Sequence, residues 1–299
     1  MPQPSSQPVQ LSLEGKTILT YGDMSRAKGS GLSLYDAKAS GGDFRVVYSV
    51  HDAVKMAQEN PQREHVFFAV GFETTAPPTA YEILKSPPSN LTFLTSYRYV
   101  PPAVEAVATS PDLAVSGFIN AGHASTVTGM KAYEPCFNQT RKPMVFAGFE
   151  PIDVLISIAM LLRQIADNEP KMENEYTRAV TWEGNLKAQA AMGKVFDRVD
   201  GYWRGVATIP ASVFTIRQEF KEYDARARFG LKETPASEQF VSEARCADVI
   251  IGKIDPPECP LYLKQCTPAS LKGPTMVSAE GTCKIWADHR ILASMWCRV

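Results

Sequence analysis

The sequence predicts an α/β fold with doubly wound parallel sheets, followed by a loop-rich tail. Short β-rich runs alternate with helical patterns up to residue 147, an order typical of parallel strands joined by crossover helices. Most of these runs are apolar throughout instead of alternating, which indicates strands covered on both faces. The tail from Arg245 onward carries most of the cysteines and many prolines, and this composition suits a small domain tied by a metal.

The expected elements follow from the apolar runs and their punctuation. Several helices begin with proline near the first turn, where its missing N–H breaks no helical hydrogen bond, and Ser49 stands in the position of an N-cap. The expected strands are Thr17–Tyr21, Phe44–Tyr48, Val66–Val70, Leu91–Thr95, Val115–Ile119 and Met144–Ala147. The expected helices are Leu32–Ala39, His51–Gln58, Pro78–Leu84, Pro101–Thr109, Val154–Ala166 and about Met172–Val195.

Charge and hydropathy exclude two broad classes of partner. The 31 Lys+Arg residues balance 32 Asp+Glu residues, a net charge of -1, so nothing in the overall charge attracts nucleic acid or anionic lipid. No apolar run reaches the roughly 18 residues that span a bilayer, and the segment Met1–Gln10 has no signal-peptide pattern. We therefore expect a cytoplasmic protein with no nucleic-acid or membrane partner, in which thiols stay reduced.

Four cysteines in the tail are the strongest chemical signal in the sequence. Cys246, Cys259, Cys266 and Cys283 lie among turn-forming prolines and glycines. Four thiolates brought together by irregular backbone suit an iron–sulfur cubane or a tetrahedral zinc ion. The close Cys-x-x-Cys pairs of zinc ribbons are absent, which favours the iron–sulfur cluster and leaves zinc as the alternative. Burial as small apolar residues is the third interpretation.

The remaining cysteines and two polar residues have simpler interpretations beside the functional ones. Cys136 is most simply a core residue and Cys297 is incidental. Glu73 follows an apolar strand, where open α/β sheets place ligands, and a charge at a helix start explains it equally well. His123 also follows a strand, and both a hydrogen-bonded structural role and a site role stay open. Ser125 is expected to cap a helix, and helix-end charge suffices for Glu150 and Asp153.

Longer motifs in the same order resemble the HypD family of hydrogenase-maturation proteins. The resemblance extends from Thr17 to Trp286 and includes the tail with its four cysteines. The internal motifs are Gly71-Phe72-Glu73-Thr74-Thr75, Gly122-His123-Ala124-Ser125, Ala147-Gly148-Phe149-Glu150-Pro151 with Asp153, Glu173-Asn174-Glu175-Tyr176, Gly184-Asn185 with Ala188-Gln189, and Trp203-Arg204-Gly205.

The resemblance implies a fold, a cofactor and partners. It implies two Rossmann-like α/β domains facing a cleft, plus a C-terminal domain in which Cys246, Cys259, Cys266 and Cys283 bind a 4Fe–4S cluster. Glu73 and His123 would line the cleft. Such proteins are scaffolds and electron conduits for the Fe(CN)2CO centre of NiFe hydrogenase, not conventional turnover enzymes. The implied partners are a HypC-like chaperone and a HypE-like cyanide donor.

The sequence departs from the family pattern at its amino-terminal end. The family's Cys-Gly-Gly-His iron-binding motif and Gly-Pro-Gly-Cys-Pro-x-Cys redox motif do not occur. A fragment, a diverged protein and one half of a split protein are the three interpretations. We accordingly expect a disordered lead over 1–14, an incomplete first α/β domain over 15–64, a second over 65–170, and a helical and cluster-binding part over 171–299.

Overall fold

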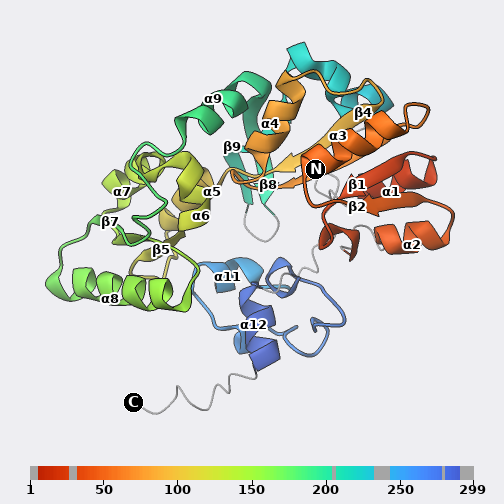
Figure 1. Ribbon diagram of the computed structural model, residues 1–299. Coiled ribbons are helices and arrows are strands. Elements are labelled where there is room, and N and C mark those ends of the chain that lie inside the picture. Colours follow the sequence, from red (N-terminus) through yellow and green to blue (C-terminus); the bar gives the residue numbers. More distant parts are fainter. Residues whose placement is uncertain (1–5, 27–31, 204–206, 232–242, 278–279, 290–299) are drawn as a thin grey trace.

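The computed structural model describes residues 6–26, 32–203, 207–231, 243–277 and 280–289. Its first sheet has four parallel strands in the order β2-β1-β3-β4 (Figure 1). The elements of this part are α1 (Ser6–Leu13), β1 (Thr17–Thr20), η1 (Met24–Arg26), α2 (Leu34–Ala39), β2 (Asp43–Val46), α3 (Val50–Glu59), β3 (His65–Gly71), α4 (Ala76–Leu84), β4 (Leu91–Tyr97) and α5 (Val100–Ala108).

Both faces of this first sheet are covered, as the apolar strands predict. Successive side chains of a strand point to opposite faces, so Val66 and Phe68 of β3 pack in one core and Phe67 packs in the other. Leu11 and Leu34 from α1 and α2 belong to the first of these cores. The doubly wound α/β organisation is therefore confirmed for this part of the chain.

The second sheet has three parallel strands in the order β5-β6-β7. Met144 and Phe146 of β6 pack against a core that contains Tyr133, while α8 lies along the sheet. The elements are β5 (Phe118–Ala121), α6 (Gly122–Thr128), η2 (Met130–Tyr133), α7 (Glu134–Thr140), β6 (Met144–Ala147), α8 (Pro151–Asp167) and β7 (Met172–Asn174).

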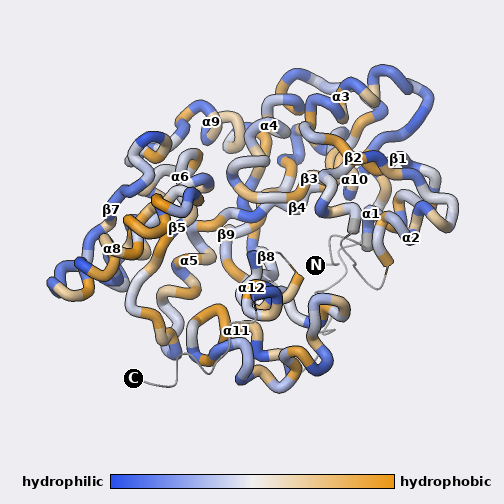
Figure 2. Tube along the Cα trace, turned by 60° about the horizontal axis from the view of Figure 1, so that its bottom comes forward, coloured by the Kyte–Doolittle hydropathy of each residue, from blue (hydrophilic) through white to orange (hydrophobic). Residues whose placement is uncertain are grey.

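Helix α8 is rich in apolar residues along its length (Figure 2), and several of them are exposed. Leu155 is 63% exposed and Leu162 is 60% exposed, so the helix carries more apolar surface than the sheet covers. No helix in the described parts of the chain is both long and apolar enough to cross a bilayer. The outward side of α8 is therefore an exposed surface that is unusually rich in apolar side chains.

A helix and a hairpin join the two sheets. Helix α9 (Leu186–Val195) contacts both α4 and α6, and its first turn is capped by the Asn185 side chain, which accepts from Ala188 N. The hairpin of β8 (Phe196–Trp203) and β9 (Ala207–Ile216) packs beside β4. The chain continues through η3 (Gln218–Tyr223) and α10 (Ala225–Phe229).

The C-terminal part of the chain consists of short elements and turns. Its small core holds Val249, Leu261 and Met276, and it docks on the segment before β5, where Ala114 N donates to Ile251 O at 3.2 Å. Lys253 also pairs with Asp112 at 2.8 Å. The elements are α11 (Cys246–Ile250), η4 (Pro256–Glu258), η5 (Pro274–Met276) and α12 (Thr282–His289).

The expected domain boundaries are wrong in two places. Residues 6–13 of the expected disordered lead form α1, because Val9 and Leu11 are buried in the first core. The expected division after residue 64 would separate β1 from β3, yet the two strands are neighbours in one sheet. The first sheet thus includes all strands up to Tyr97, and the second begins at Phe118.

Two expected elements also differ from the structure. The strand expected at Val115–Ile119 lies at Phe118–Ala121, because the preceding residues form the docking segment for the C-terminal part. The helix expected over Met172–Val195 is helical only from Leu186. Met172–Asn174 instead forms β7, and Gly184 takes a positive φ of 71° that ends any helical continuation.

Gly129 lies so close to the backbone of residues 182–184 that we expect a single added methyl group to lower the stability of the chain. Gly129 has a φ of +74°, and a Cβ there would lie 2.3 Å from Trp182 O. Gly129→Ala should lower the free energy of unfolding by more than about 1 kcal/mol, measured by urea denaturation. Gly193→Ala in α9 is the matched control, because a Cβ at this position meets open space. This substitution should raise the free energy of unfolding by about 0.5–1 kcal/mol, since alanine favours a helix more than glycine does. Equal midpoints for the two variants would contradict this account.

Candidate functional site

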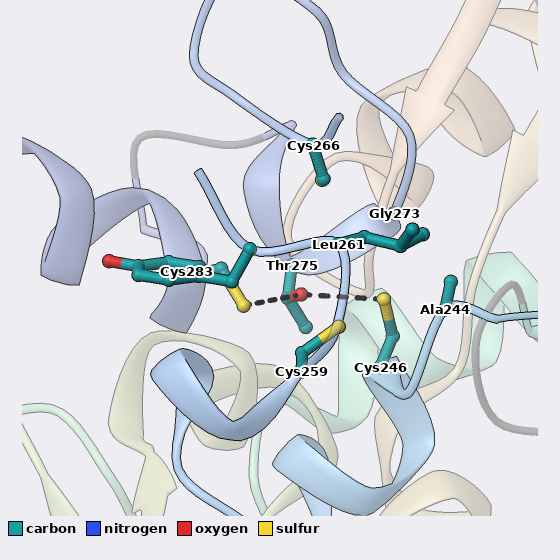
Figure 3. Close-up of a pocket in the computed structure, with 9 residues that line it drawn as sticks. Ala244, Cys246, Cys259, Leu261, Cys266, Gly273, Thr275 and Cys283 are labelled. Atoms are coloured by element: carbon teal, nitrogen blue, oxygen red, sulfur yellow. Dashed lines mark hydrogen bonds between the residues drawn. The ribbon is translucent and has the colours of Figure 1, made fainter. Parts of the chain in front are cut away.

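The four tail cysteines come from four separate local structures and line one pocket (Figure 3). Cys246 begins α11, Cys259 follows η4, Cys266 follows a tight turn, and Cys283 lies in α12. Figure 3 shows the sulfur atoms of Cys246, Cys259 and Cys283 turned toward a common space beside Thr275. The pocket, named here the cysteine pocket, is lined by Ala244, Cys246, Cys259, Leu261, Tyr262, Cys266, Gly273, Thr275 and Cys283.

Local turn chemistry brings the two middle cysteines together. Asp255 and Glu258 form a capping box around η4, which ends at Cys259. Leu261 O then accepts from Cys266 N at 2.9 Å, and Leu263 takes a left-handed φ of 52° inside this turn. The spacing of the cysteines is therefore set by hydrogen-bonded turns instead of by a regular element.

The thiols are reduced and mostly buried. Cys246, Cys259, Cys266 and Cys283 are all free, and only Cys259 is partly exposed. Burial raises the pKa of Cys246 and of Cys283, while a hydrogen bond from Thr275 opposes this shift for each. Both thiols consequently keep their protons more readily than free cysteine does. A metal that binds here must displace those protons.

One wall of the cysteine pocket lies directly against a sulfur. Gly273 is required on this side, because a Cβ there would lie 2.3 Å from Cys246 Sγ. The pocket is therefore defined by its four cysteines and by the missing side chain at Gly273.

Two further cysteines were expected to stand apart from this set. Cys136 is buried in the core of the second sheet, and burial raises its pKa to about 11. Its expected role as a core residue is therefore confirmed. Cys297 lies outside the described residues.

Glu73 lies at the carboxyl end of β3, but it is enclosed by protein. Its side chain is fully buried, and one carboxyl oxygen accepts from Val100 N at 2.5 Å, the first backbone amide of α5. The second carboxyl oxygen has no hydrogen-bond partner in the described part of the chain. Burial raises the pKa of Glu73 to about 7, against the opposing effect of the Val100 hydrogen bond. Contrary to our expectation, Glu73 does not face an open cleft.

His123 lies at the surface, at the carboxyl end of β5. Its ring packs against Phe149 and Tyr176 at centroid distances of 4.3 and 5.5 Å. The His123 Nε2 lies 3.3 Å from the Tyr176 hydroxyl, so one nitrogen is held and the ring orientation is fixed. No described hydrogen bond or ring contact joins His123 to Glu73, which were expected to share one cleft.

The edge of the second sheet gathers groups that the sequence alone does not connect. Asp153 is buried, and both its oxygens accept from Arg178 at 2.5 and 3.0 Å. This pairing holds the pKa of Asp153 below its usual value, and Arg178 also stacks over the Tyr176 ring. Asp153 was interpreted only as a helix-end charge, and the position of Arg178, distant in sequence, gave no sign of the pair.

Two glycines make this edge compact. A Cβ at Gly122 would lie 2.3 Å from Ala147 O, and one at Gly148 would lie 1.9 Å from an Asp153 oxygen. Three strand ends therefore approach one another only because these positions lack side chains. The edge presents an imidazole, a phenol and a guanidinium together, which can hydrogen-bond or orient a small anionic or polar group.

We expect the buried Glu73 carboxyl to make stability depend on pH. Its pKa is about 7 in the folded chain against 4.5 as the ordinary value, so the folded state holds the proton more tightly. The free energy of unfolding should therefore fall as pH rises from 4.5 to about 7, by up to roughly 3 kcal/mol. Glu73→Gln should remove this slope in urea denaturation. Identical slopes for both chains would contradict the assignment.

Comparison with known proteins gives the family. The family described as "HypD: Hydrogenase formation hypA family" matches residues 6–290. The chain is 41% identical over 282 residues to the hydrogenase maturation factor HypD of Azotobacter vinelandii, covering 91% of this chain and 74% of the relative. It is 41% identical over 287 residues to that of Cupriavidus necator, covering 92% and 75%.

A more distant relative shows the same agreement. The chain is 39% identical over 277 residues to the hydrogenase maturation factor HypD of Escherichia coli (strain K12), covering 91% of this chain and 73% of the relative. The match therefore includes both sheets and the cysteine pocket. This chain belongs to the HypD family of hydrogenase maturation factors.

Proposed function

We propose that this chain acts in NiFe-hydrogenase maturation as a scaffold and electron conduit for assembly of the Fe(CN)2CO centre. The observation that carries the proposal is the convergence of four free cysteines on one enclosed pocket. A scaffold of this kind needs a redox centre, a place for the assembled group and surfaces for partners. Each requirement has a counterpart in the chain.

Four thiol donors suit both a 4Fe–4S cluster and a tetrahedral zinc ion, and we propose the cluster. In a tetrahedral zinc site with Zn–S bonds of about 2.3 Å, the sulfurs lie only about 3.8 Å apart. A cubane spreads four thiolates over four irons, and the sequence has no close Cys-x-x-Cys pair of the zinc-ribbon kind. The glycine at 273 also keeps one wall clear of a Cβ. These features support the cluster.

The chain's own residues would divide the work between ligation and protection. Cys246, Cys259, Cys266 and Cys283 would be the ligands, and a cluster bound there would supply reversible electron transfer. Leu261, which lines the cysteine pocket, and Met276 beside it in the small core are both buried, and they would limit the access of water to a bound cluster. Low water access favours a stable thiolate–metal site, since hydrolysis and oxidation both need solvent.

The edge of the second sheet would serve as the place where the assembled group is held. His123 stands at the surface with its ring fixed by Phe149 and Tyr176, and it can donate or accept one hydrogen bond. Arg178, paired with the buried Asp153, lies over the Tyr176 ring beside it. Glu73 is enclosed in the first sheet, and we propose no contact between it and a group held at this edge. The contacts of His123 support it as the candidate functional residue of the α/β part.

Helix α8 is the surface at which we propose that a partner protein docks. Among the described residues, its outward side leaves Leu155 and Leu162 exposed. Exposed apolar surface of this kind is typical of protein–protein contact. A HypC-like chaperone and a HypE-like cyanide donor are the partners that the proposed role requires.

The cluster proposal predicts a metal content and its dependence on single cysteines. Anaerobically purified chain should be brown, with about four irons and four sulfides per chain by chemical analysis. Cys266→Ser should lose most of this iron, because one ligand is removed. Cys136→Ala is the matched control and should keep the full content, since its thiol lies in another core. A colourless chain with one zinc would contradict the proposal and support a zinc-stapled interaction protein instead.

A further inference from the structure

A hydroxyl group lies directly against two sulfurs of the cysteine pocket. Thr275 belongs to η5 and is buried, with 8% of its surface exposed. Its Oγ1 lies 3.1 Å from Cys283 Sγ and 3.6 Å from Cys246 Sγ, as the dashed lines in Figure 3 mark. Thr275 is therefore placed beside two of the four proposed ligands.

The two contacts cannot be equal. A threonine hydroxyl has one hydrogen, so it donates to one sulfur at a time. The distance to Cys283 is the shorter by half an ångström, and sulfur acceptors tolerate longer contacts than oxygen does. Cys283 thus receives the stronger hydrogen bond, and the pocket becomes electrically asymmetric.

The backbone holds this hydroxyl in place. Pro274 begins the turn, Met276 N donates to Gly273 O at 3.1 Å, and Met276 itself is fully buried. A β-branched side chain also has few rotamers, which limits how Oγ1 can move. The geometry around the sulfurs is consequently preorganised before any group binds.

We propose that Thr275 is a positioning residue whose hydrogen bond to Cys283 Sγ raises the reduction potential of the centre held by the four cysteines. The inference rests on the proposed function. Reduction adds one negative charge that spreads onto the thiolates, and a hydrogen-bond donor stabilises the more negative state more strongly. Removing the donor should therefore make reduction harder.

A purely structural role makes a different prediction. If the hydroxyl only fills space and satisfies a buried polar group, its loss changes stability and leaves the potential where it was. Thr275→Val keeps the shape and removes the donor. Thr275→Ser keeps the donor and loses one methyl group. The pair of variants separates hydrogen bonding from packing.

The experiment is a redox titration of the anaerobic, cluster-loaded chain with dithionite and mediator dyes, monitored by absorbance. We expect Thr275→Val to lower the midpoint by about 30 to 59 mV, which is a three- to tenfold change in the one-electron equilibrium constant. Thr275→Ser should stay within a few mV of the unmodified chain. Thr282→Val is the matched control, because it is exposed next to Cys283 and none of its described hydrogen bonds reaches a sulfur.

Each outcome of the redox titration tests either the role of Thr275 or the proposed function on which it rests. A full iron and sulfide content with an unchanged midpoint in Thr275→Val overturns the role of Thr275 and leaves the proposed function standing. An unmodified chain that assembles no cluster overturns both. If Thr275→Val does not retain its cluster, pulsed electron–nuclear resonance on the unmodified chain in D2O decides. An exchangeable proton coupled to the reduced cluster, kept in Thr275→Ser, supports the inference, and its absence overturns it.

Discussion

The meeting of four free cysteines at one pocket is the main constraint on the C-terminal part of the chain. Its apolar core is small, with Val249, Leu261 and Met276 as the main buried side chains besides three of the cysteines themselves. A segment of this size rarely gains enough from hydrophobic burial to hold a single shape, and small domains normally add disulfides or metals. Its cysteines are free, so the thiolate–metal bonds that we propose would supply the remaining strong constraint. A bound cluster would then add to the stability of a part whose turns and hydrogen bonds already bring the cysteines together.

The rest of the molecule positions this part with respect to the sheets. The contacts of Ala114 with Ile251 and of Asp112 with Lys253 attach it to the segment that leads into β5, and His123 follows two residues after the end of β5. The same short stretch of chain therefore connects the cysteine pocket to the edge of the second sheet. The first sheet joins this arrangement through α9, which contacts helices of both sheets. The proposed redox centre and the proposed holding site would then lie on one connected support, which suits an assembly scaffold.

Much of this organisation was visible in the sequence, and the misses have physical reasons. Apolar runs such as Met144–Ala147 predicted strands because burial on both faces leaves no polar alternation. The four cysteines were predicted to converge because turn-forming residues surround them. The three residues of β7 were missed because so short a strand has no periodicity, and its pairing with β6 is a tertiary contact. The Asp153–Arg178 ion pair and the hydrogen bond from Thr275 to Cys283 were also missed, because each is a tertiary contact that no local sequence pattern indicates.

The most direct test of a common inorganic centre is to locate it. Anaerobic crystals of the chain, measured at wavelengths on both sides of the iron absorption edge, give an anomalous difference map that shows iron and no other common metal. The account predicts one compact iron peak inside the cysteine pocket, within bonding reach of Cys246, Cys259, Cys266 and Cys283. Iron density elsewhere in the molecule, or sulfurs of these residues that point into separate cavities, would contradict it.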